Sequence, residues 1–274
     1  MFLQKLIQWE KEIADQVPYL ETPTNLFLGI DDAHKAGYSC TPIDAIPFAW
    51  TGQDGIHYAF LTDFGTANSL DEAPIIRVSP MDFGECVRLV ARNIRDFFAI
   101  HLFDNGSLLL NEFASEQAYV DHMRRLEEEE EALEYLDVQR WKTETNFVAE
   151  RAQEAFQLPL IDNPYHYIQE IRRDRLRQIV LKTKDGLGVI PVGDKRQTYE
   201  PHPWSSVEPD HTHLDKGVLQ AFFNHAEYET KLAFIRDFQQ RAMDDTEANE
   251  WLCGEIVKMG LALEAKNLRG RMMA

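Results

Sequence analysis

Residues 45–62 read Ala45-Ile-Pro-Phe-Ala-Trp50, Thr51-Gly-Gln-Asp-Gly55 and Ile56-His-Tyr-Ala-Phe-Leu-Thr62. Two apolar and aromatic runs therefore flank a short turn whose glycines, Gly52 and Gly55, tolerate positive φ. This pattern predicts a β-hairpin with strands at 45–50 and 56–62. We expect this part of the chain to be organised around an antiparallel sheet that contains the hairpin.

The residues on both sides of the hairpin continue the same pattern. From about 24 to 113, short apolar runs are cut by Gly, Pro and Asp, which predicts strands and tight turns, with strands at 74–78 and 108–110. A helix at 92–103 should pack on the sheet, because its apolar residues recur with helical spacing. That stripe consists of Ile94, Phe97, Phe98, His101 and Leu102. His101 is therefore expected to be a core or boundary residue.

The ends of the chain are predicted to be helical. Residues 1–17 form an amphipathic helix that Pro18 ends. After residue 113, a long helix follows about residues 119–136 and carries the acidic run Glu127 to Glu131, and a second helix covers 144–157.

Asn163 and Pro164 predict the start of a third helix in this half, because Asn caps free amides and Pro fits the first turn. Asp185-Gly186 then predicts a short hairpin near 179–192, and 193–214 is expected to be a loop. The chain should end with one helix at about 218–238 and another from Asp244 to about Leu268. We expect helix in at least about 40% of the whole chain, above the usual third.

Together these patterns predict an α+β fold. A mainly antiparallel sheet backed by helices should occupy residues 1–113, and a largely helical region should occupy 114–274. The formal net charge of −18 divides equally between the two parts, so neither is merely an acidic tail.

The composition excludes several classes of function. With 28 Lys and Arg against 46 Asp and Glu, the chain repels nucleic acid and anionic lipid, so neither nucleic acid nor a membrane is expected as a partner. There is no apolar run long enough to span a membrane, and the charged beginning does not resemble a signal peptide, so we expect a cytoplasmic protein. Three scattered cysteines indicate neither a disulfide framework nor a cysteine-based zinc site.

Histidines in the 193–214 loop are the densest group of possible metal ligands. They are His202, His211 and His213, with Asp210 beside them. Their spacing matches no closed zinc site, so we expect no metal and no cofactor. The usual catalytic motifs are also missing, which favours a protein that is not an enzyme. A metal-dependent hydrolase built on these histidines is the third hypothesis. Basic residues at 172–184 are expected to neutralise the protein's own acidic helices.

The predicted hairpin turn offers the best candidate for a binding surface. Trp50 and Tyr58 are candidate anchors for a partner, because Trp and Tyr dominate binding hot spots when polar residues surround them. Asp54, Asp31 and Asp32 are the predicted charged surround. The alternative is that the aromatic residues pack in the core, since alternate strand positions must face it.

Three stretches resemble bacterial members of the SUKH superfamily, which also contains the yeast cell-wall-assembly regulators. They are the hairpin at 46–58, Val78-Ser79-Pro80, and the helix start Leu89-Val-Ala-Arg-Asn-Ile-Arg-Asp-Phe-Phe98. The resemblance covers about residues 20–113. It does not extend to the early part, where Asp31-Asp-Ala-His-Lys-Ala-Gly37 stands in place of the family's Asn-Gly-Gly.

The resemblance implies a non-enzymatic α+β module that binds another protein. Many bacterial relatives are immunity proteins that neutralise toxins, often nucleases, and a basic partner would suit the acidity of this chain. No site residue is carried over, because the surfaces of such proteins vary with their partners. The main alternative is a cytoplasmic regulatory or scaffold protein that acts through its helical half.

Overall fold

The computed structural model describes residues 1–30, 38–103, 106–131, 137–192, 197–206, 216–238 and 246–272. Helices account for 51% of these residues, and a five-stranded antiparallel sheet accompanies them, so the predicted α+β class is confirmed.

The sheet has the simplest order, with each strand paired to the next one in the sequence. Its strands are β1 (Phe27–Leu28), β2 (Ala45–Trp50), β3 (His57–Leu61), β4 (Ile75–Val78) and β5 (Val87–Ala91). The predicted hairpin is confirmed as β2 and β3, with Ala45 opposite Leu61 and Trp50 opposite His57. β1 and β5 were not predicted as separate strands.

One predicted strand is wrong. Residues 108–110 lie in α3 (Ser107–Leu110), a single helical turn. Gly106 precedes it in the left-handed conformation, with φ of 65°, and the Asn111 amide donates to the Ser107 carbonyl oxygen. Leu108 and Leu109 are both buried, which successive residues of a strand with one covered face are not. The apolar run is therefore helical.

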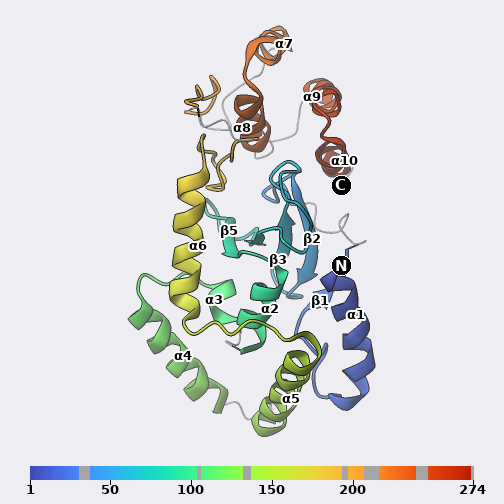
Figure 1. Ribbon diagram of the computed structural model, residues 1–274, viewed down its shortest axis with the longest axis vertical. Coiled ribbons are helices and arrows are strands. Elements are labelled where there is room, and N and C mark those ends of the chain that lie inside the picture. Colours follow the sequence, from blue (N-terminus) through green and yellow to red (C-terminus); the bar gives the residue numbers. More distant parts are fainter. Residues whose placement is uncertain are drawn as a thin grey trace.

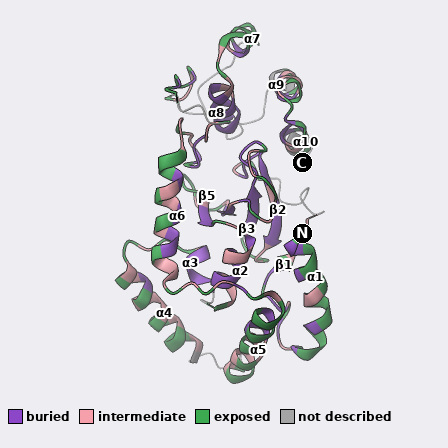
Figure 2. Ribbon diagram, in the orientation of Figure 1, coloured by how far each residue is buried: buried purple, intermediate pink, exposed green. Residues whose placement is uncertain are grey.

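Two helices of the N-terminal half cover the sheet. α2 (Ile94–Phe103) confirms the predicted helix, and its Phe97 and Phe98 rings pack against Phe48 of β2. α1 (Phe2–Ile13), extended by a 3-10 turn (Ala14–Gln16), places Phe2 beside Phe98. His101 is a boundary residue whose Nε2 donates to the Thr24 carbonyl oxygen at 2.6 Å. Figure 2 shows buried strands beside α2, with α1 at the edge of the sheet.

The next helices belong to the same core. They are α4 (Glu116–Glu131), α5 (Val138–Phe156) and α6 (Pro164–Gln178). The predicted cap of α6 is confirmed, because the Asn163 side chain accepts from the His166 amide. Ala152 of α5 and Ile168 and Ile171 of α6 share one apolar cluster with the sheet. The core thus continues across residue 113, the expected boundary.

The last helices form a second core. They are α7 (Lys216–His225), α8 (Tyr228–Phe238), α9 (Thr246–Lys258) and α10 (Ala262–Met272). The single helix predicted at 218–238 is divided between α7 and α8. The rings of Phe222 and Phe234 lie 5.4 Å apart, whereas twelve residues on one helix would separate them by about 18 Å. The helix predicted to run to Leu268 is also divided, at Gly260, whose φ is 84°.

Figure 1 shows the sheet in the middle of the molecule, with α7–α10 beyond one end and α4 and α5 beyond the other. α6 runs along β5, and its Arg172 donates to the Leu89 carbonyl oxygen. The hairpin predicted near 179–192 is reduced to one isolated bridge, between Leu181 and Val189. Among the described residues, no helix is long and apolar enough to cross a membrane.

Candidate functional site

Two turns extend from the same end of the sheet. The β2–β3 turn comprises residues 51–56 and the β4–β5 turn comprises residues 79–86. His57, the first residue of β3, lies opposite Val78, the last residue of β4. Both turns therefore extend from the same end of the sheet, one at the start of β3 and the other at the end of the neighbouring strand β4. We call the exposed and half-exposed side chains at this end the tip surface: Phe27, Tyr38, Trp50, Asp54, Met81 and Phe83.

The β2–β3 turn is held in one conformation. Gly52, Asp54 and Gly55 all have positive φ, which confirms the predicted role of the two glycines. The Thr51 amide donates to the Ile56 carbonyl oxygen at 3.2 Å. Buried His57 donates from Nδ1 to the Gly55 carbonyl oxygen at 2.8 Å. The turn is thus fastened to a side chain inside the fold.

Aromatic rings lie against this turn on both sides. Phe27 of β1 is paired with Trp50, and a Cβ added at Gly52 would lie 2.8 Å from its ring. Tyr38 packs over Gly55 and stacks on His57, with ring centroids 5.9 Å apart. Phe27 and Tyr38 nevertheless remain 41% and 40% exposed. The glycines therefore allow two rings to lie flat on the turn while facing solvent.

The β4–β5 turn presents the most exposed aromatic residue described. Phe83 is 85% exposed and Met81 is 61% exposed. The turn is not loose, because the Ser79 amide donates to the Cys86 carbonyl oxygen at 2.8 Å and the Glu85 amide to the Asp82 carbonyl oxygen at 3.0 Å. The Asp82 carboxylate also pairs with the buried Arg77 guanidinium. A fixed backbone thus holds two apolar side chains in water.

The structure divides the predicted binding residues. Asp54 is exposed and Trp50 is half-buried, and both lie at the tip. Tyr58 was wrongly predicted as a surface anchor, because it is 1% exposed and its ring packs 4.7 Å from that of Phe97. Its position in β3 faces α2, so the core-packing alternative holds for it. Asp31 and Asp32 lie outside the described residues.

Sequence reasoning missed four residues of the tip surface. They are Phe27, Tyr38, Met81 and Phe83. The signal for two of them was present, since Met81 and Phe83 stand between Pro80 and Gly84 in a segment too short to bury them. Phe27 and Tyr38 reach the turn only through the sheet pairing and the chain path, which the sequence pattern does not encode.

The opposite end of the sheet holds a cluster of buried charges. Asp44 precedes β2, Asp63 follows β3, and both are buried. Arg236 of α8 donates to both Asp44 carboxylate oxygens, and to Asp63 Oδ1 at 3.1 Å. Arg175 of α6 makes two parallel hydrogen bonds to Asp63, each 2.6 Å long. These four residues join the sheet, α6 and α8, and we call them the ionic cluster.

Electrostatics within the ionic cluster favour the charged forms. Burial alone would raise the pKa of Asp63, but Arg175 and Arg236 outweigh it and hold that pKa below its usual value. Asp185 lies close by, and burial raises its pKa despite the nearby Arg236. The Arg236 guanidinium also lies 4.9 Å from the Phe64 ring centroid. This arrangement is structural, because every guanidinium nitrogen of Arg175 and Arg236 donates to an oxygen of the protein.

Basic residues of the 172–184 segment pair with the protein's own acidic groups, as expected, and the ion pairs described for them do not involve the acidic run of α4. Arg172 pairs with Glu112 and Arg177 with Asp174, in addition to the Arg175–Asp63 pair.

His202 also has a structural position. Its Nε2 lies 3.0 Å from Asp237 Oδ2, its ring meets Phe234 edge-on, and it is 2% exposed. The other oxygen of Asp237 accepts from the Lys184 amide. Asp210, His211 and His213 lie outside the described residues. In the part of the chain that is described, no three His, Cys, Asp or Glu side chains converge as metal ligands would.

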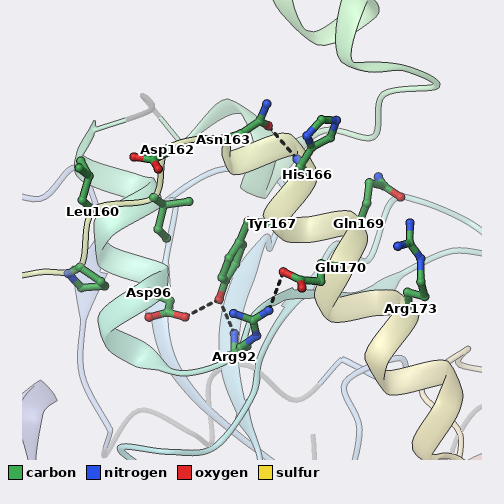
Figure 3. A pocket seen from close by; sticks show the side chains of 12 residues that line it. Arg92, Asp96, Leu160, Asp162, Asn163, His166, Tyr167, Gln169, Glu170 and Arg173 are labelled. Atoms are coloured by element: carbon green, nitrogen blue, oxygen red, sulfur yellow. Dashed lines mark hydrogen bonds and ion pairs between the residues drawn. The ribbon is translucent and has the colours of Figure 1, made fainter.

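A cavity of about 630 Å³ lies beside the first turns of α6. Figure 3 shows the side chains that line it, most of them polar. At its base the Tyr167 hydroxyl donates to Asp96 at 2.7 Å and accepts from the Arg92 amide at 2.9 Å. The Arg92 side chain is in turn paired with Glu170 at 2.9 Å. These polar groups are hydrogen-bonded to one another. The base of the cavity therefore connects α2, the end of β5 and α6.

No model of a protein family matches the chain, and no curated protein matches it significantly.

Proposed function

We propose that this chain is a non-enzymatic protein-binding module that recognises a basic protein partner with its tip surface. The observation that carries the proposal is the 85% exposure of Phe83 on a hydrogen-bonded turn. When a partner covers a large apolar side chain that a fixed backbone holds in water, burial of that apolar surface stabilises the complex. The ordering cost of binding is also low, because the turn is already fixed.

The composition of the tip surface supports the same function. Aromatic residues and Met are enriched in protein interfaces, and anchors of this kind contribute most of the binding energy. Phe27 of β1, Tyr38 and Trp50 of β2 lie beside the β2–β3 turn, and Met81 and Phe83 lie on the β4–β5 turn. Asp54 adds an exposed charge on the β2–β3 turn.

The chemistry of the partner follows from charge. A protein with a formal net charge of −18 attracts basic proteins and repels acidic ones. The resemblance to the SUKH superfamily supports a narrower role, that of a cytoplasmic immunity protein that neutralises a basic, nuclease-type toxin. On this proposal the protein works by covering its partner, with neither metal nor cofactor.

The test compares two variants that each remove one exposed apolar side chain. Phe83→Ser changes the tip surface, and Leu160→Ser changes a residue that is 90% exposed on the α5–α6 connection. Immobilised wild-type protein and each variant are incubated with an extract of the source organism, and retained proteins are identified by mass spectrometry. We expect a basic protein that is retained by wild type and L160S and lost with F83S. Equal retention by F83S would contradict the proposal.

A further inference from the structure

A cavity of about 670 Å³ adjoins the tip surface. It lies between the C-terminal end of α2, the helices α4 and α5, and the β2–β3 turn. Thr51 and Gln53 of that turn form part of its wall, together with Phe103, Trp141 and Met123. Its volume is in the range of sites that hold small molecules or side chains of a partner. A protein seated on the tip surface would therefore lie at its opening.

Two polar groups in the wall are left without a hydrogen bond. Nδ1 of His101 and Oγ1 of Thr145 are both buried from solvent, and the described residues supply no partner for either. Since Nε2 of His101 faces the Thr24 carbonyl oxygen, Nε2 carries the proton. Nδ1 is then a hydrogen-bond acceptor. Burial lowers the pKa of His101, which keeps the ring neutral and Nδ1 unprotonated.

The electrostatics of the cavity favour a cation. Glu127 and Glu130 of α4 line it. Among the described residues of its wall Lys142 of α5 is the only Lys or Arg, with Nζ 3.9 Å from Glu130 Oε2. The C-terminal end of α2 also faces it, and the carbonyl groups there carry partial negative charge. Tyr58 contributes a phenol whose pKa is raised by burial, so it stays neutral.

We infer that this cavity accepts an arginine side chain of the basic partner. The guanidinium group supplies donors for the two carboxylates of α4 that line the wall. Its remaining donors can satisfy the His101 nitrogen and the Thr145 hydroxyl once neighbouring side chains of the wall move to admit them. The apolar stem of arginine and its flat head suit the aromatic wall formed by Trp141 and Phe103. This inference rests on the proposed function, because the partner on the tip surface brings the side chain to the opening.

The experiment uses two probes of nearly equal shape. N-acetyl-arginine-N-methylamide carries the guanidinium group, and the corresponding citrulline compound replaces it with a neutral urea group. Each is titrated into the full-length protein and followed by amide NMR shifts. We expect the arginine probe to shift the amides near Thr51, His101 and Thr145, with a dissociation constant on the order of 1 mM. Citrulline should bind at least about tenfold more weakly.

A charge-removing pair of variants locates the site. Glu130→Gln changes the cavity wall, and Glu154→Gln removes one charge from the exposed Arg151–Glu154 pair on α5. We expect E130Q to weaken the arginine probe by about fivefold or more and E154Q to leave it unchanged. Equal binding of the two probes, or shifts confined to other residues, would overturn the inference.

The two proposals fail in different ways. If F83S still retains the basic partner, the proposed function fails, whatever the probe does. If F83S loses the partner while the arginine probe does not bind and E130Q keeps full affinity for the partner, the tip surface stands and the arginine site is refuted.

Discussion

At the Asp44 end of the sheet four charged side chains are buried, whereas at the tip end four large apolar side chains remain between 40% and 85% exposed. The first end is covered by α6 and α8, whose arginines reach the carboxylates of Asp44 and Asp63. At the second end these four apolar side chains remain exposed, although α4 and α5 lie beyond the same end of the sheet. Both ends have fixed backbones, so the difference lies in what the rest of the chain supplies.

This contrast indicates that the ionic cluster serves stability and the tip surface serves recognition. Burying paired charges contributes little net stability, but it makes the joint between sheet and helices intolerant of losing one partner. Leaving apolar groups on rigid turns forgoes some stability and keeps a surface ready for a partner. Substitutions at the first end should therefore change folding, and those at the second should change binding.

The largest effect is expected from Arg236→Met. It leaves Asp44 without its cation and Asp63 with only Arg175, so the free energy of unfolding should fall by about 3–5 kcal/mol. Urea denaturation followed by circular dichroism measures the change. Arg177→Met, which removes an exposed pair with Asp174, is the matched control and should cost under about 1 kcal/mol. A loss below about 1 kcal/mol for R236M would show that the ionic cluster is not a joint.

The next largest effect on stability distinguishes buried Tyr58 of β3 from exposed Phe83 of the β4–β5 turn. Tyr58→Ala removes a buried ring and should lower the free energy of unfolding by about 3 kcal/mol or more. Phe83→Ala removes an exposed ring and should change it by less than about 0.5 kcal/mol. Thermal and urea unfolding of both variants provide the measurement. Similar losses in the two would mean that Phe83 is packed in solution.

A smaller effect should appear in the pH dependence of stability. Burial, with a contribution from nearby Asp44, raises the pKa of Glu264 from 4.5 to about 7. Because the folded state holds this proton more tightly, the stabilisation is complete below pH 4.5 and is lost as the pH rises through 7. E264Q cannot lose a proton, so it should gain about 1–2 kcal/mol over wild type between pH 5 and pH 8. An unchanged difference between the two proteins over that range would refute this.

Asp63 should change the stability with pH in the opposite direction to Glu264. Its pKa is held below the ordinary value of 3.8, so the stability it contributes is present above that pH and is lost as the pH falls below it.

The smallest effect concerns a single charge at the tip. Asp54→Asn should weaken binding of the basic partner by under about 1 kcal/mol, and mainly through a slower association rate. Surface plasmon resonance at several salt concentrations measures both rates. The association rate of wild type should itself fall steeply as added salt shortens the Debye length below about 10 Å. A D54N effect confined to dissociation would argue against steering by charge.

Local sequence patterns predicted most of the fold, because turns, helix stripes and helix caps depend on residues that are close in the sequence. The hairpin at Gly52 and Gly55, the apolar stripe of α2 and the Asn163 cap are all set within a few residues. The exceptions depend on distant contacts. The strand expected at 108–110 became a helical turn, and the division of the helix expected at 218–238 brings aromatic rings of α7 and α8 together.

The candidate site was predictable only in part for the same reason. Trp50 and Asp54 follow from the turn itself, whereas burial of Tyr58 depends on which face of β3 α2 covers. The pairing of Asp44 with Arg236 spans 192 positions, and no periodicity or motif indicates it.

Hydrogen exchange of the complex with the captured partner tests the central claim most directly. Amides in residues 51–56 and 79–86 should exchange about tenfold more slowly, or slower still, once the partner is bound. Amides in residues 62–67, at the opposite end of the sheet, should exchange at the same rate with and without it. Protection of the opposite end, or of the helices alone, with no change in the two turns would contradict the assignment of the tip surface as the site of recognition.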